Sequence, residues 1–346
     1  MKTMRNLINA IMMLQLFAAN MNTTATETLT TENAHTYWET ALIYLAGPKL
    51  IHDQCAQLTK IPEGNSKTVE FNVVQDLSTD IDSNTLAEGV PGDGQQLTIT
   101  PITVEVAQYG NYVEISDMLQ LTAKHGMFKV ATNKLSSQAA GVGDKITRNK
   151  MHECTTSFVA GGVASLSKIT ADTYLTVDDI FKAAARLKGK DTPTFGDGCY
   201  RAIAHPYVTK DLMSNAKETT AWMDIKKYAN PEDILNGEVG KVGQVRVLET
   251  TNAKYYKAGD EAISDAASGV TVFATIVLGD DAVGTTELSG MGLSMIIKSA
   301  AEIGGPLEQY GTAGWKMTKA AEILCDDYIT KIYSSASEAN LITASN

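Results

Sequence analysis

The sequence predicts an α+β protein, because the period of its hydrophobic pattern changes along the chain. Residues 68–74 and 97–115 are rich in Val, Ile, Thr and Tyr and alternate apolar with polar positions, which is typical of strands. Residues 116–158 then carry apolar side chains at helical intervals, and the chain beyond residue 163 alternates short strand and short helix signatures. With 346 residues, the chain can bury a sizeable core in about two domains.

Residues 1–35 predict a flexible N-terminal arm. Residues 21–35 are rich in Thr, Asn and Glu and nearly lack large apolar side chains, so they cannot bury enough surface to become ordered by themselves. Lys2 and Arg5 before the apolar stretch 10–19 imitate a secretory signal peptide, but Gln15 interrupts that stretch and no small-x-small cleavage pattern follows. We therefore favour an arm that docks on a partner over a secretion signal.

The next two segments predict a helical lead-in and a projecting hairpin. Residues 36–66 have helical spacing up to Leu58, broken at Gly47 and Pro48. Residues 67–115 contain the two long strands, joined by the polar connection 76–96, which is too long for a tight turn. We expect an extended β-hairpin whose tip does not touch its own core.

Residues 116–162 predict a unit built on a long helix. Ser116 is placed to cap the helix at its start. Gly126, Gly141 and Gly143 weaken the pattern and predict a kink or a break. An unbroken helix of forty residues would be about 60 Å long, more than a compact domain needs. We therefore expect the helical segment 116–158 to act as a strut, that is, an elongated support that extends beyond a compact domain.

Residues 163–311 predict an α/β body. Thr176 and Asp179 have the spacing of a capping box, and the helix that they begin ends at Gly189. A buried strand over 199–204 leads into His205 and Pro206, with Pro206 in the first turn of a second helix. Further strands are predicted over 244–250, 270–278, 292–298 and 315–332. We expect residues 312–346 to return as strands to the hairpin-and-helix half and to end in a tail.

No group of residues has the spacing of a catalytic, cofactor or metal site. The four cysteines are far apart, which predicts free, mostly buried thiols in a reducing compartment. His52 with Asp53 suggests an acid/base pair and His205 a metal ligand, but a surface pair and a structural histidine are favoured. Ser294 lacks the second glycine of a nucleophile elbow. The sequence predicts no enzyme, cofactor, metal site or membrane span, and a metal-dependent enzyme is the weaker alternative.

The net charge of −11 is concentrated in one segment. Residues 68–123 hold nine acidic side chains and no lysine or arginine, whereas residues 124–158 have a positive balance. A solvated acidic hairpin is the simpler interpretation for a lone monomer, but within an assembly opposite charges would align neighbouring subunits. The candidate contact residues are Asp76, Asp80, Asp82, Glu88 and Asp93 of the hairpin and Lys124, Lys129 and Lys134 of the helix.

A series of short motifs in collinear order carries a family resemblance. The motifs are IHDQ (51–54), IPEGNSKTVEF (61–71), LAEGVPGDG (86–94), VAQYGNYVEISD (106–117), DKITRN (144–149), HPYVTKDL (205–212), GEVGKVGQVRVLET (237–250), LGDDAVG (278–284) and PLEQYGTAGWKMTKAAEIL (306–324). With these motifs, over roughly residues 40–335, the chain resembles the major capsid proteins of tailed bacteriophages, specifically the N-four type.

The resemblance implies the Hong Kong 97 type capsid fold, with an N-arm, an extended loop, a spine helix in a peripheral domain and an axial domain. It implies a structural protein of the virion that is assembled in the host cytoplasm. Hexamers and pentamers would form an icosahedral shell around double-stranded DNA bound without sequence specificity. A separate scaffolding protein and a portal would be partners, with decoration proteins left open.

Some capsids of this fold crosslink themselves by a lysine-to-asparagine isopeptide bond from the hairpin loop. Because residues 68–123 contain no lysine, we expect no such crosslink here. The competing structural class is a secreted surface-layer protein.

Overall fold

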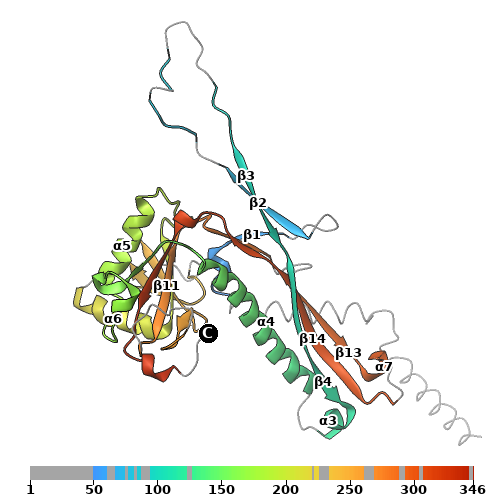
Figure 1. The fold of residues 1–346 in the computed structure, drawn as a ribbon. Helices are drawn as coiled ribbons and strands as arrows, with labels where there is room; N and C mark the ends of the chain where they lie inside the picture. Colours follow the sequence, from blue (N-terminus) through green and yellow to red (C-terminus); the bar gives the residue numbers. More distant parts are fainter. Residues whose placement is uncertain are drawn as a thin grey trace, which may run out of the picture.

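The computed structural model describes residues 50–60, 67–74, 77–81, 84–86, 94–122, 127–219, 222–225, 234–260, 269–287, 293–303, 307–342 and 346. Figure 1 shows a rounded body, a helix-and-sheet unit that extends from it, and a hairpin that projects in the opposite direction. The predicted arm (1–35) and most of the predicted lead-in (36–66) lie outside the described residues. The chain also contains two short α-helices, α3 (Asp117–Thr122) and α7 (Ala300–Ile303), in addition to the longer elements described below.

An eight-stranded mixed sheet forms the centre of the body. One of its inner strands, β11, is buried along its whole length, which requires packing on both faces. Phe273 and Val277 point into the core beneath α5 (Val177–Lys188) and α6 (Pro206–Thr219), while Ile276 and Leu278 point into a second core on the other face. The order is β5 (Ser157–Val159), β16 (Ile329–Ser334), β11 (Val272–Leu278), β6 (Tyr200–Ala204), β9 (Val245–Glu249), β8 (Glu238–Val242) and β7 (Trp222–Asp224), with β10 (Tyr255–Tyr256) also paired to β11.

Two helix starts in this half of the chain form as the sequence predicts. The Thr176 hydroxyl accepts a hydrogen bond from the Asp179 backbone N–H, and the Asp179 carboxylate accepts one from the Thr176 N–H, so the capping box is complete. The helix ends at Lys188 with Gly189 as its C-cap. Pro206 is the first residue of α6, where its missing N–H costs nothing.

The helix-and-sheet unit consists of α4 (Met127–Met151) packed on a three-stranded antiparallel sheet, in the order β13 (Leu293–Lys298), β14 (Tyr310–Lys319) and β4 (Ala107–Ser116). Leu135 and Ala139 of the helix are buried against the sheet. The predicted break at Gly141 and Gly143 is wrong, because both residues lie inside a continuous helix. The helix ends at Met151 rather than near residue 158, and Gly126 lies outside the described residues.

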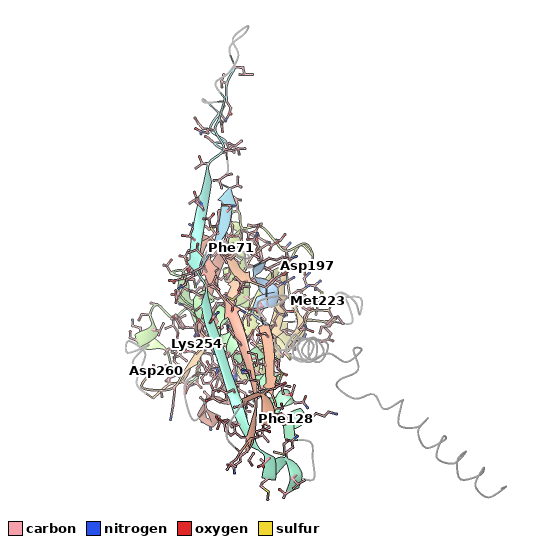
Figure 2. The ribbon with its side chains drawn as sticks, turned by 90° about the vertical axis from the view of Figure 1, so that its right-hand side faces the viewer. Phe71, Phe128, Asp197, Met223, Lys254 and Asp260 are labelled. Carbon is pink, nitrogen blue, oxygen red and sulfur yellow. The ribbon has the colours of Figure 1, made fainter. Side chains whose placement is uncertain are left out.

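The hairpin consists of β2 (Thr68–Val74) and β3 (Ile99–Glu105), which pair antiparallel over their full length. One long strand over 97–115 was predicted, and this prediction is wrong, because the chain changes partner at Val106. β2 is only seven residues long, so the next segment, β4, leaves the hairpin and pairs with β14 instead. The structural hairpin therefore ends at Glu105 within the predicted range 67–115. Figure 2 shows Phe71 at its base.

The final strands divide between the two halves. β14 returns to the helix-and-sheet unit, whereas β16 pairs with β11 and β5 in the body. Conversely β13, which falls in the predicted body range 163–311, lies in the helix-and-sheet unit. A small sheet of β1 (Gln57–Thr59), β12 (Val283–Thr286) and β15 (Ala321–Ile323) lies between the halves. Residues 53–59 form a 3-10 turn and β1 rather than the predicted helix.

Candidate functional site

The hairpin is anchored at its base and exposes apolar side chains farther out. Val69, Phe71 and Val104 are buried against Ala320 at the base. Farther out the exposed fraction reaches 80% for Ile81. Other exposed large apolar side chains are the cross-strand pair Val74 and Ile99 at the outer ends of β2 and β3, and Leu77, Leu86 and Leu97 beyond them. Large exposed apolar patches mark surfaces that bind a partner, so the distal hairpin is a candidate contact surface.

Of the predicted contact charges, the three that the structure describes lie on two separate elements. Asp80 is exposed on the hairpin, and Lys129 and Lys134 are exposed on α4. Figure 1 shows the hairpin extending away from α4, so a contact between them requires two copies. The other predicted members, Asp76, Asp82, Glu88, Asp93 and Lys124, lie outside the described residues.

A second apolar surface lies on the side of the three-stranded sheet that faces away from α4. Ile296, Gly314 and Tyr112 are direct neighbours across the three strands, and the two side chains are exposed. A Cβ at Gly314 would lie 2.8 Å from the Cβ of Tyr112, so glycine is required there. Together these residues line a shallow groove of about 440 Å³ that also includes Lys298.

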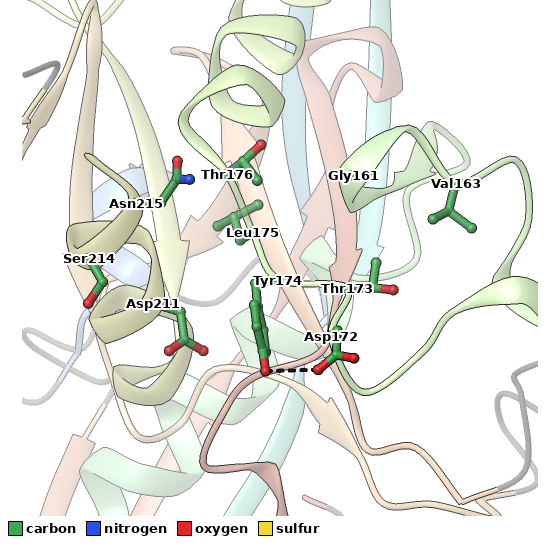
Figure 3. Close-up of a pocket in the computed structure, with 10 residues that line it drawn as sticks. All are labelled: Gly161, Val163, Asp172, Thr173, Tyr174, Leu175, Thr176, Asp211, Ser214 and Asn215. Atoms are coloured by element: carbon green, nitrogen blue, oxygen red, sulfur yellow. Dashed lines mark hydrogen bonds between the residues drawn. The ribbon is translucent and has the colours of Figure 1, made fainter. Parts of the chain in front are cut away.

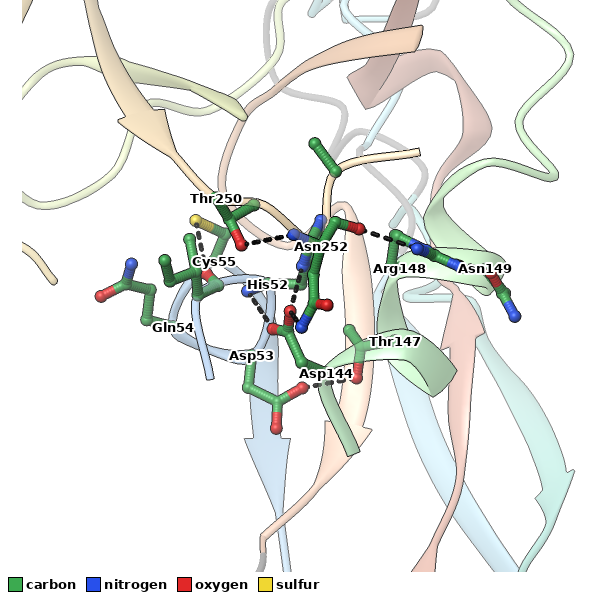
Figure 4. Close-up of polar contacts among 12 residues, drawn as sticks. His52, Asp53, Gln54, Cys55, Asp144, Thr147, Arg148, Asn149, Thr250 and Asn252 are labelled. Atoms are coloured by element: carbon green, nitrogen blue, oxygen red, sulfur yellow. Dashed lines mark hydrogen bonds and ion pairs between the residues drawn. The ribbon is translucent and has the colours of Figure 1, made fainter. Parts of the chain in front are cut away.

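A buried polar joint, formed by His52, Asp53, Asp144, Thr147, Asn252 and Lys319, links the two halves. Asp144 of α4 is fully buried. Its carboxylate accepts hydrogen bonds from the His52 backbone N–H at 2.8 Å and from Asn252 Nδ2 at 3.1 Å, and His52 Nδ1 lies 2.9 Å from it. Figure 4 shows the three side chains converging from the segment before the hairpin, the long helix and a body loop.

The second part of the polar joint is a buried ion pair. Lys319 Nζ at the end of β14 lies 2.5 Å from Asp53 Oδ2, and both side chains are nearly inaccessible to solvent. The Thr147 hydroxyl of α4 donates to the other oxygen of Asp53. The joint therefore fixes residues 52–53 against both the helix and the sheet.

The surroundings of Asp144 keep its carboxyl group ionised. Burial alone would raise its pKa, because desolvation disfavours the charged form. The hydrogen bonds and the electrostatic attraction from His52, together with the hydrogen bond from Asn252, outweigh burial and lower the pKa below its ordinary value. The joint is thus a charged structural connection at neutral pH.

Sequence reasoning missed this joint. It interpreted His52 and Asp53 as a pair on a helix surface, and both side chains are buried. The available signal lay in α4, where Asp144 and Thr147 occupy the same helical face as the apolar residues Ala140 and Met151. Polar side chains within an apolar stripe indicate buried partners elsewhere in the chain.

His205 has a structural role at the start of α6. Its Nδ1 accepts a hydrogen bond from the Tyr207 backbone N–H, as expected of an N-cap residue. The ring contacts Tyr207, Tyr255 and Phe273. Burial lowers the pKa of His205 to about 4, so the ring is neutral at pH 7.

The pocket in Figure 3 contains two carboxylates that already have partners. It has a volume of about 460 Å³ and lies between α6 and residues 161–176. The Tyr174 hydroxyl donates to Asp172, and Asp211 accepts from both the backbone N–H and the hydroxyl of Ser337. These contacts stabilise the fold of the body.

The remaining candidate groups have no catalytic arrangement. The four cysteines are free, and burial raises the pKa of the Cys55 thiol to about 12 and that of Cys154 to about 11. Within the described ranges, no three His, Cys, Asp or Glu side chains gather as a metal site. No helix among these residues is long and apolar enough to cross a membrane.

Comparisons with known proteins give similarity in structure only. No family model and no curated protein matches the chain. The capsid of Ralstonia phage GP4 superposes with a TM-score of 0.65 at 13% identity over 81% of this chain and 87% of that one. The head of Helicobacter pylori bacteriophage KHP40 gives 0.58 at 10% identity over 82% and 87%. The holo-SrpI encapsulin complex from Synechococcus elongatus PCC 7942 gives 0.50 at 10% identity over 82% and 86%.

These similarities define the fold. The chain has the Hong Kong 97 type architecture, and the predicted α+β class is confirmed. The assignment of the hairpin, the long helix and the body to the extended loop, spine helix and axial domain of that fold stays a prediction.

Proposed function

We propose that this chain is the major capsid protein of a tailed bacteriophage and that it self-assembles, as hexamers and pentamers, into an icosahedral shell around double-stranded DNA. The observation that carries the proposal is a capsid-type fold whose hairpin and sheet both expose large apolar side chains among the described residues. The shell would assemble in the host cytoplasm and form part of the virion. The chain would act as a structural protein and not as an enzyme.

Within this class, the collinear motifs of residues 40–335 support membership of the N-four type. A separate scaffolding protein would guide assembly, and a portal would occupy one vertex. Decoration proteins on the outer surface are a further class of partner that the resemblance allows. Because residues 68–123 hold nine of the net negative charges, the rest of the chain is nearly neutral. DNA inside the shell is therefore not excluded by repulsion.

Electron microscopy of the purified full-length chain tests whether the protein forms shells. We expect closed shells, or rings of five and six subunits when no scaffolding protein is present. Flat two-dimensional lattices would favour the surface-layer alternative, and a chain that stays monomeric at tens of micromolar would contradict the proposal. Since an encapsulin shares the fold, DNA extracted from native particles is the measurement that distinguishes a genome shell.

For the subunit contact, we propose that the acidic hairpin (Asp76, Asp80, Asp82, Glu88, Asp93) lies over the basic residues Lys124, Lys129 and Lys134 of a neighbouring subunit, the last two of which lie on its α4. Reversal of Asp80 and Asp82 to Lys should reduce shell yield while the subunit stays folded. Combination with Lys129→Glu and Lys134→Glu should restore part of the yield, because the attraction is re-formed with opposite signs. Asp178→Lys on the body surface is the control. Normal assembly of the first variant contradicts the contact.

A further inference from the structure

A groove between α4 and the body lies next to the polar joint. Its volume is about 490 Å³. Ser137 and Gly141 line it on the helix side, and Pro206 and residues 249–252 line it on the body side. Unlike the groove on the outer sheet face, this one has a carboxylate in its wall.

That carboxylate belongs to Glu249, the last residue of β9, and it has no partner in the part of the chain that the structure describes. The side chain is half-buried, and burial raises its pKa. No cation or hydrogen-bond donor of the described residues contacts it. By contrast, Asp144 and Asp53 are fully paired. A carboxylate withdrawn from water costs free energy until a cation or donor compensates it.

The helix side of the groove is kept open by a glycine. A glycine in a helix interior costs about 1 kcal/mol relative to alanine. At Gly143 the structure explains that cost, because a Cβ would lie 3.4 Å from Met317 Sδ and 3.5 Å from Leu50 Cδ2. At Gly141 a Cβ would meet no atom within 4 Å. Nothing within the described subunit requires a glycine at this position.

We propose that this groove receives a lysine side chain from a second copy of the chain, whose ammonium group pairs with Glu249 and whose stem passes over Gly141. The inference rests on the proposed self-assembly, and charge complementarity carries the choice of occupant. Lysine is favoured because the chain has 24 lysines and 5 arginines. Three of those arginines, Arg148, Arg201 and Arg246, already make internal contacts. The hairpin has no basic residue in 68–123, so this contact is distinct from the acidic contact proposed above.

Two groove variants of the full-length chain, Glu249→Gln and Gly141→Gln, test the inference. The first removes an uncompensated charge and the second improves helix propensity, so neither should lower the melting temperature of the unassembled subunit. Each should reduce the yield of closed shells at least tenfold. As controls, Glu153→Gln alters a carboxylate paired with Lys150 of its own chain, and Gly196→Gln adds a side chain in open space. Both controls should assemble like the parent.

Zero-length crosslinking provides a measurement that needs no variant. Parent shells built from mixed ¹⁴N and ¹⁵N subunits are treated with a carbodiimide, and the Glu249 peptide should be joined to a lysine peptide of the other isotope. The Glu153–Lys150 pair, 3.0 Å apart in one chain, is the positive control for the reaction. If Glu249 couples only to lysine peptides of its own isotope, or if both groove variants form normal shells, the groove contact is overturned and the proposed function still stands. Failure of the parent to form shells or capsomers overturns the proposed function and the inference with it.

Discussion

Asp53 and Lys319 form an ion pair that is excluded from water, so each charge depends on the other. We expect Asp53→Asn to lower the free energy of unfolding by about 3–5 kcal/mol, because it leaves the Lys319 ammonium buried without a counter-charge. Denaturant unfolding of the unassembled subunit measures this loss.

The matched control removes both charges. In Asp53→Asn with Lys319→Met no uncompensated charge remains, so more than half of the lost stability should return. A double variant as unstable as Asp53→Asn would show that the pair is not the source of the effect.

His205 makes the stability of the subunit depend on pH. Its folded pKa of about 4 lies below the ordinary value of 6.5, so the unfolded chain binds a proton that the folded chain excludes. The contribution to stability is fully present above pH 6.5 and is lost as the pH falls toward 4, by about 3 kcal/mol in all. Unfolding measured between pH 7.5 and 4 reports this loss.

His205→Asn isolates the histidine from other titrating groups. Asparagine is a good N-cap residue and can accept the Tyr207 N–H without titrating. The parent should therefore lose more stability than the variant between pH 6.5 and 4. Identical pH profiles for the two proteins would contradict the assignment.

Local patterns predicted residue roles only where the partners are local. His205 beside Pro206 and the Thr176–Asp179 box involve neighbours within four positions, and the sequence alone indicated both. His52 pairs with Asp144, 92 positions away, and Asp144 in turn accepts a hydrogen bond from Asn252, a further 108 positions along the chain. No spacing rule connects them, so the polar joint could not be predicted.

At the scale of elements, the base of the hairpin depends on one close approach. The ring of buried Phe71 packs over Gly284 of β12, where a Cβ would lie 2.5 Å from the ring. Gly284→Ala should therefore destabilise the subunit by about 1–3 kcal/mol through overpacking, measured by denaturant unfolding. Phe71→Leu in the same chain should recover part of the loss, and Gly196→Ala, with open space around it, should have little effect. Unchanged stability of Gly284→Ala would contradict this packing.

Element types followed from the hydrophobic period, but strand partners did not. The alternation over 97–115 correctly indicated extended chain, yet it contains no information on where β3 ends its pairing with β2 and β4 begins to pair with β14. Similarly, glycine propensity predicted a break in α4. Packing of the helix on its sheet overrides that preference, because tertiary burial supplies more stability than propensity removes.

For the whole molecule, we expect a shell held by non-covalent contacts. Residues 68–123 contain no lysine to form an isopeptide bond from the hairpin. Denaturing electrophoresis of mature particles should show the shell protein as a monomer band, with no band at the mass of its dimer or of larger oligomers. A ladder of covalent oligomers would refute this expectation.

The position of β16 has a consequence for biosynthesis. This strand inserts between β5 and β11 in the body sheet, although it comes much later in the chain than either of them. Roughly 50 residues separate the end of β11 from the start of β16, or about 3–10 s of translation at 5–20 residues per second. During that interval β11 lacks its partner β16, so the body sheet stays incomplete on that side. The body therefore cannot finish folding until synthesis has passed Ser334, the last residue of β16.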